Sequence, residues 1–151
     1  MMAVAGDRDI TRIGSGSAYE PKAAYCRAVV AGGWILVSGT VGNNHQTMQV
    51  PDRVQDQCAL ALDHIRAALA KAGASFSDVV RVTYVLPDRD DFEPCWPLLR
   101  EVFGNNPPAA MMIQAGLIDP AMKIEIEVTA RVPRDAPARA NSADAGQSTG
   151  P

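Results

Sequence analysis

The sequence predicts an α+β fold in which two helices cover one face of a mixed β-sheet. Three observations support this prediction. Strand-like and helix-like segments follow one another in the order β-β-α-β-α-β-β. The pair Gly32-Gly33 separates the first two strand-like runs, as in a β-hairpin. Two helices also cannot cover both faces of a sheet of about five or six strands, so we expect a partner subunit on the other face.

The segments are defined by periodicity and by turn residues. Asp52 can cap the first helix and Gly73 can end it, while Pro87-Asp88 ends the strand before the second helix. The expected helices span residues 52–72 and 92–103. The expected strands span residues 25–31, 34–41, 79–86, 110–117 and 123–132, the last two joined by a turn at 118–120, with room for a short strand near 10–13.

Composition indicates one folded domain with unstructured ends. We expect residues 1–9 to be a flexible leader and residues 10–133 to form the domain. Apart from two prolines, residues 134–151 contain no apolar side chain larger than alanine, so they cannot bury enough surface to offset the entropy of ordering. This last segment is therefore predicted to be a disordered tail.

Charge and rare residues exclude several functions. The net charge of −3 offers no footprint for nonspecific nucleic-acid binding. The three cysteines form no C-x-x-C pair and there are only two histidines, so a metal centre is not expected. No run approaches the roughly 20 apolar residues that span a bilayer, and charge appears at Asp7 before any signal-like segment. We expect a cytoplasmic protein without a membrane or nucleic-acid partner.

A few residues could carry chemistry. Glu125 and Glu127 alternate with apolar residues and share one strand face, which suits either a general acid/base in a cleft or a solvated surface. Gly39 permits close approach of the backbone, and the hydroxyls of Ser38 and Thr40 can bond a ligand or the local backbone. The cysteines and His64 fit packing or boundary positions better than catalytic ones.

Several motifs together resemble one known family. They are YCRAV, WILVSGT, ALAKAGA, DVVRVTYVLPD, FGNNPPAAMMI and MKIEIEVTA, which lie between residues 10 and 132. They resemble the reactive-intermediate deaminase (Rid) or YjgF family, also labelled L-PSP endoribonuclease and translation inhibitor. The resemblance implies a chorismate-mutase-like fold and a homotrimer with a ligand cleft between subunits. It also implies no metal or organic cofactor, and hydrolysis of small 2-imino or 2-enamino acids to 2-keto acids and ammonia.

The resemblance also implies roles for individual residues. Glu125 matches the family glutamate that positions or activates water, and Tyr25 matches a tyrosine that shapes the cleft. Ser38 and Gly39 match the family's S-G step. We expect the lining of the small-molecule cleft to be completed by Thr40, Ala110, Met112 and, as an apolar wall, Trp96.

One departure from the family pattern leaves two functions open. The deaminase motif P-A-R-[ST] carries the arginine that clamps the substrate carboxylate, and Ala110 stands at that place here. The chain is then either a deaminase-like hydrolase or a non-catalytic trimer that binds a ligand or a protein. Arg27 or Arg81 could reach the cleft instead, although each also suits a surface or interface strand. The net charge and the lack of a His pair argue against a ribonuclease.

Overall fold

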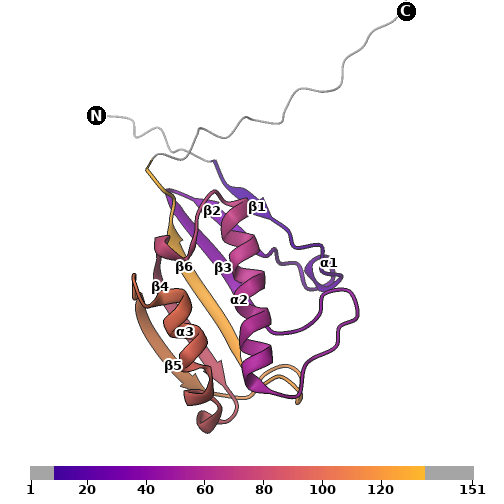
Figure 1. Cartoon of the computed structure of the whole chain (residues 1–151). Coiled ribbons are helices and arrows are strands. Elements are labelled where there is room, and N and C mark those ends of the chain that lie inside the picture. Colours follow the sequence, from indigo (N-terminus) through magenta and orange to yellow (C-terminus); the bar gives the residue numbers. More distant parts are fainter. Residues whose placement is uncertain (1–8, 135–151) are drawn as a thin grey trace, which may run out of the picture.

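The computed structural model describes residues 9–134, which form one six-stranded sheet with helices packed on it (Figure 1). The terminal segments expected to be a leader and a tail lie outside the described residues, except for their inner ends. The strands are β1 (Thr11–Ile13), β2 (Ala28–Ala31), β3 (Trp34–Val41), β4 (Val79–Leu86), β5 (Ala109–Gln114) and β6 (Glu125–Arg131). The α-helices are α1 (Tyr19–Ala23), α2 (Val54–Lys71) and α3 (Trp96–Phe103).

The sheet is mixed, as predicted. Its strand order is β1-β2-β3-β6-β4-β5, in which β4 and β5 run parallel and all other neighbours antiparallel. The last two strands of the chain do not form a hairpin: β6 inserts between β3 and β4, whereas β5 pairs with the outer side of β4. The crossover through α3 brings β5 back parallel to β4, so the turn at 118–120 belongs to a longer connection.

The hairpin between β2 and β3 forms at Gly32-Gly33, as predicted. Both glycines have positive φ, 55° and 81°, which suits the tight turn that joins antiparallel strands. Ala31 pairs with Trp34 across this turn, and Ala28 pairs with Val37 farther along. This register sends Ile35 and Val37 into the core and leaves Trp34 on the opposite face.

The ends of α2 agree with the prediction at one end only. Gly73 has a φ of 76° and follows the last helical turn, where Ala74 N–H donates to Leu69 O. The predicted cap at Asp52 is wrong, because Arg53 occupies the N-cap position and no side chain caps the helix.

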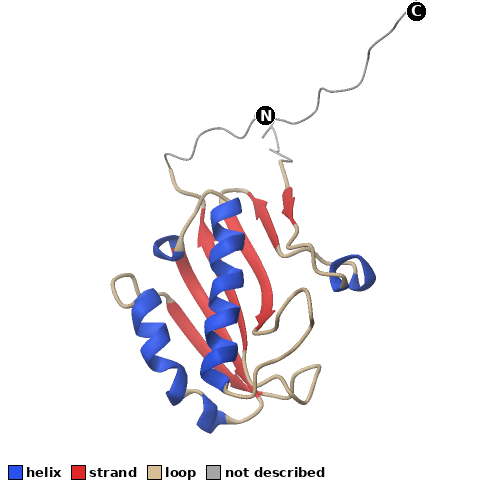
Figure 2. Ribbon diagram, turned by 45° about the vertical axis from the view of Figure 1, so that its right-hand side comes forward, coloured by secondary structure: helices blue, strands red, loops and turns tan. Residues whose placement is uncertain are grey.

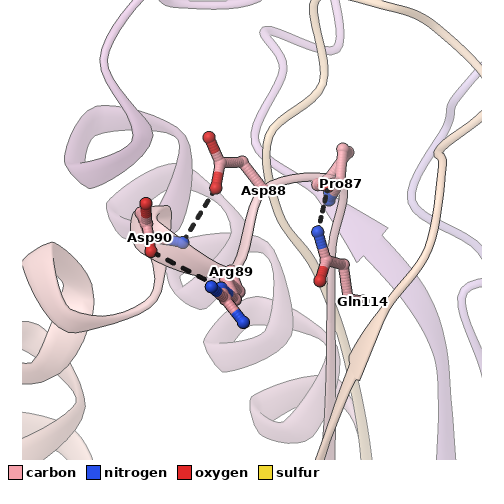
Figure 3. Close-up of polar contacts among 5 residues, drawn as sticks. All are labelled: Pro87, Asp88, Arg89, Asp90 and Gln114. Atoms are coloured by element: carbon pink, nitrogen blue, oxygen red, sulfur yellow. Dashed lines mark hydrogen bonds and ion pairs between the residues drawn. The ribbon is translucent and has the colours of Figure 1, made fainter.

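The segment before α3 is less regular than predicted. The helix begins at Trp96 and not at residue 92, because two short 3₁₀ turns precede it (Arg89–Asp91 and Glu93–Cys95). Asp88 caps the first of these turns by accepting the N–H of Asp90 at 2.9 Å (Figure 3). Gln114 Nε2 donates to Pro87 O at 3.2 Å, which ties the end of β5 to the turn after β4. The short helix α1 has no counterpart in the predictions, because five residues are too few to show a period.

The two long helices cover one face of the sheet and leave the other open (Figure 2). Alternate strand residues such as Ile35, Val82 and Ile126 are buried beneath the helices. The open face presents large apolar side chains that are 39–48% exposed: Trp34, Leu36, Met111 and Ile113. No helix within residues 9–134 is long and apolar enough to cross a membrane.

Candidate functional site

A cavity of about 690 Å³ opens near α1, where two long loops approach the ends of β3 and β6. The first loop joins β3 to α2, and the second joins β5 to β6. The lining residues most relevant to chemistry are Tyr25, Arg27, Gly39, His45, Asp119 and Glu125. Of the eight residues expected at the site, the cavity therefore brings together three: Tyr25, Gly39 and Glu125.

Glu125 reaches the cavity because of an irregularity in β3. The register between β3 and β6 shifts between Val37 and Thr40, so Ser38 and Gly39 form a bulge opposite Glu127, and Glu125 pairs with Val41 just beyond it. The Glu125 carboxylate occupies the space above Gly39, where an added Cβ would stand 2.1 Å from Oε1. Only glycine at residue 39 leaves room for this position of the carboxylate.

The Glu125 carboxyl is protonated more readily in this environment than it would be in water. Burial is the main cause that raises the pKa of its carboxyl above the ordinary value. Arg27 opposes this effect by lowering the pKa, while the like charge of Glu127 raises it further. A carboxylate with a raised pKa in a cavity has the properties of a general base or acid.

Arg27 lies in the cavity wall, whereas Arg81 does not line the cavity. The Arg27 side chain is only 6% exposed. Its Nη1 donates to Gly39 O at 3.0 Å and to Thr40 Oγ1 at 2.8 Å. Its guanidinium carbon lies 5.7 Å from the centre of the Tyr25 ring. Among the described residues its Nε is buried without a hydrogen-bond partner.

The two hydroxyls expected at the site bond the local backbone. Ser38 Oγ donates to Cys26 O at 2.7 Å, and Thr40 Oγ1 donates to Ser38 O at 2.7 Å. Thr40 is 1% exposed, so it supports the bulge from below and does not line the cavity. These hydroxyls could have bonded either a ligand or the local backbone, and in the structure both bond the backbone.

Three other expected site residues lie elsewhere on the chain. Trp96 and Ala110 line a second cavity of about 300 Å³ beside α3, together with Arg100. Met112 lines a small hollow with Leu86 and Arg89. Within one chain these residues do not share a cavity with Glu125, so a common site would need a second copy of the chain.

A pair of histidines lies beside the cavity, so the expectation that the chain has no His pair is wrong. The His45 and His64 rings stack with their centroids 3.6 Å apart and an interplanar angle of 9°. The His64 Nε2 lies 2.8 Å from Asn43 O. Burial, with smaller effects of His64 and Arg27, lowers the pKa of His45. Residues 19 positions apart on a loop and a helix carry no sequence signal of such a contact. Within the described residues no group of three or more His, Cys, Asp or Glu could hold a metal ion.

Comparison with known proteins places the chain in a family. The model of the endoribonuclease L-PSP family matches residues 15–132. The chain belongs to this family. Its members are also called YjgF, RutC or Rid proteins, so the resemblance seen in the sequence motifs is confirmed.

Relatives of this L-PSP family chain include proteins with named activities. A 2-iminobutanoate/2-iminopropanoate deaminase from Rattus norvegicus is 33% identical over 108 residues, covering 71% of this chain and 79% of the relative. A RutC family protein from Pyrococcus horikoshii is 31% identical over 115 residues, covering 76% of this chain and 91% of the relative. The crystal structure of a YjgF/YER057c/UK114 family member from Mycobacterium tuberculosis superposes with a TM-score of 0.74 at 33% identity, covering 82% of this chain and 99% of the other.

Proposed function

We propose that this chain hydrolyses the C=N bond of small 2-imino acids. The observation that carries the proposal is the partly buried Glu125 carboxylate, which lies in a cavity with Tyr25 and has a raised pKa. The printed name of the rat relative, a 2-iminobutanoate/2-iminopropanoate deaminase, supplies the substrate class. Family membership alone does not fix the chemistry, because fold and activity vary independently.

The reaction needs one acid/base group near the imine carbon. Water adds to this carbon while Glu125 accepts a proton from the water. This proton passes to the nitrogen, which completes the carbinolamine with its hydroxyl and NH2 groups. Glu125 then carries the hydroxyl proton to the nitrogen, the C–N bond breaks as the C=O bond forms, and ammonia leaves. The products are the 2-keto acid and ammonia, which together contain all the atoms of imino acid and water. Tyr25 contributes its ring and phenol to the wall of the cavity.

The proposed active assembly is a homotrimer with clefts between subunits. The exposed apolar side chains on the open sheet face, such as Trp34 and Leu36, favour burial against other copies. In such an assembly, the cavity beside α3 that contains Ala110 would border the Glu125 cavity of a neighbouring copy. The two cavities would then form one cleft. Trp96 and Met112 would then reach the cleft from the neighbour.

The direct test supplies 2-iminopropanoate, generated in place by an amino-acid oxidase, and follows its loss. The wild-type chain is expected to accelerate hydrolysis, and Glu125→Gln to reduce turnover by about 100-fold or more, as expected for loss of a general base. Glu127→Gln is the matched control on the same strand, and at pH 8 it should stay within about threefold of wild type, as surface changes usually do. Wild-type rates equal to buffer with several imino acids would refute the proposal.

The second candidate is a trimer that binds a small ligand without transforming it. Ala110, which stands at the place of the family's substrate-clamping arginine, favours this candidate. The two candidates differ in the response to Glu125→Gln. A binding protein should show only a changed affinity, whereas a hydrolase should lose turnover with binding largely retained.

A further inference from the structure

Arg27 is a buried cation in the wall of the Glu125 cavity that makes no salt bridge with a described residue, while Glu20 and Glu125 interact with it electrostatically at longer range. The Arg27 residue is only 6% exposed. Within residues 9–134 the ion pairs are Arg66–Asp63 and Arg89–Asp90, so Arg27 has no carboxylate at salt-bridge distance. A buried charge without a partner is costly, which makes such a group a candidate for binding a ligand of opposite charge.

Within residues 9–134 one edge of the Arg27 guanidinium has no protein partner, and because its Nε atom is covered, a ligand would reach that atom only after a small shift of the covering side chains. Both bonds start from Nη1, which holds the backbone and hydroxyl of the bulge at Gly39 and Thr40. The buried Nε has no partner. The Nε and Nη2 atoms form the edge that binds a carboxylate through two parallel hydrogen bonds. A guanidinium with a purely structural role would have this edge satisfied by the protein.

The surroundings of Arg27 suit a small anion. The Tyr25 ring, 5.7 Å from the guanidinium carbon, restricts the orientation of the side chain. The nearby His45 has a lowered pKa, so at neutral pH it adds no competing positive charge. Arg27 and Glu125 line the same cavity of about 690 Å³ without forming an ion pair, so one ligand in this cavity can contact both.

We propose that Arg27 binds the carboxylate of the ligand in this cavity. Ala110 cannot perform this role, because its side chain has no hydrogen-bond donor. The substrate class is therefore a small 2-imino monocarboxylate, held with its carboxylate on Arg27 and its imine carbon toward Glu125. This inference rests on the proposed function for the identity of the reacting group. Recognition of the carboxylate by Arg27 does not depend on turnover.

The experiment measures binding of pyruvate and of its neutral amide, pyruvamide, by titration calorimetry. The wild-type chain should bind pyruvate about tenfold or more tightly than pyruvamide, because charge-assisted bonds are lost with the amide. Arg27→Gln should remove this preference, whereas Arg27→Lys should weaken pyruvate binding but keep the preference. Arg66→Gln, on the exposed face of α2, is the matched control and should behave as wild type.

Three results would overturn the inference. They are no detectable pyruvate binding by the wild-type chain, wild-type pyruvate affinity in Arg27→Gln, and loss of that affinity in Arg100→Gln instead. Arg100 is the competing cation because it lines the cavity that contains Ala110. If Arg27→Gln fails to fold, a crystal structure of the wild-type chain with pyruvate decides between contact with Arg27 Nε or Nη2 and contact elsewhere.

The outcomes for the two proposals are separable. If the chain binds pyruvate through Arg27 but hydrolyses 2-iminopropanoate no faster than buffer does, the proposed function is refuted and this inference is supported. A wild-type chain that hydrolyses the imine, with an unchanged KM in Arg27→Gln, supports the function and refutes the inference.

Discussion

The carboxylate of Glu125 lies against Gly39 so closely that a Cβ at residue 39 would stand 2.1 Å from Oε1. Gly39 belongs to the bulge in β3, and the Glu125 side chain reaches it from the neighbouring strand β6, where Glu125 pairs with Val41. The Nη1 of Arg27 then binds the carbonyl oxygen of the same glycine. Gly39 therefore contacts both charged groups in the cavity, Glu125 through the space left by its missing side chain and Arg27 through its carbonyl oxygen.

The first prediction concerns this contact. Gly39→Ala should displace the Glu125 carboxylate and reduce imine hydrolysis by about 100-fold, because a shift of about 1 Å in a catalytic group can have that effect. Because the added methyl group meets only the end of the flexible Glu125 side chain beside a cavity, the carboxylate can turn away and the free energy of unfolding should change by less than about 1 kcal/mol. Kinetics and urea unfolding measure the two effects.

The control for this change is Gly116→Ala, because an added Cβ at Gly116 meets nothing within 4 Å. It should keep wild-type activity. Wild-type activity in Gly39→Ala would show that the Glu125 position seen here is not the one that reacts.

The second prediction is a pH dependence set by Glu125. The base acts when ionised, so the rate should rise with pH through a pKa that lies above the ordinary carboxyl value. Glu127→Gln removes a like charge, lowers the pKa of Glu125 and should move this limb of the profile to lower pH. Rate profiles of both proteins test the shift, and a carboxyl titration by NMR tests it without turnover. A shift to higher pH would contradict the assigned cause.

The third prediction concerns stability in acid. The pKa of His45 in the folded state lies below its ordinary value of 6.5, chiefly because of burial. Because the pKa is lowered in the folded state, the unfolded state binds the proton more readily. The contribution of His45 to the free energy of unfolding is therefore complete above about pH 7, and it is lost as the pH falls toward and through the folded-state pKa. His45→Gln should lose less stability than wild type between pH 7 and about 5.

Urea unfolding at several pH values measures this dependence. Gln46→Ala, which changes the neighbouring exposed residue without altering any ionisable group, should follow wild type. Identical pH dependence of wild type and His45→Gln would remove His45 as the cause.

The fourth prediction concerns the open face of the sheet. Leu36 is 48% exposed there, so Leu36→Asp should place a charge in the proposed interface and convert a trimer into monomers. Ala70→Asp, at an exposed position on α2, is the control and should leave the assembly intact. Sedimentation velocity distinguishes the species. A monomeric wild-type chain would refute the trimer outright.

The sequence predicted the fold more completely than the site, for physical reasons. The β2–β3 hairpin and the end of α2 depend on glycines with positive φ, which leave a local signal at Gly32-Gly33 and Gly73. The insertion of β6 between β3 and β4 depends on contacts distant in the chain, so no local pattern reveals it. Alternation placed Glu125 on the face opposite the core. It could not show that a bulge would bring Gly39 and Arg27 beside it.

The fifth prediction joins the trimer to the carboxylate site. In the Arg27→Gln background, Ala110→Arg should restore at least about tenfold of the lost pyruvate affinity, since it adds a guanidinium at the position where the resemblance implies a carboxylate-binding arginine. The rescue requires that β5 of one copy border the Glu125 cavity of another, because Ala110 and Glu125 line separate cavities within one chain. Titration calorimetry with pyruvate measures it.

The matched control for this rescue is Ala109→Arg in the same background. Ala109 pairs with Arg81 and Ala110 pairs with Val82, so the two alanines point to opposite faces of β5. An arginine at residue 109 should therefore leave pyruvate affinity unrestored. Equal rescue by both variants would indicate a general effect of added positive charge. No rescue by Ala110→Arg in an intact trimer would place β5 of the neighbour away from the cavity, and the carboxylate would then depend on Arg27 alone.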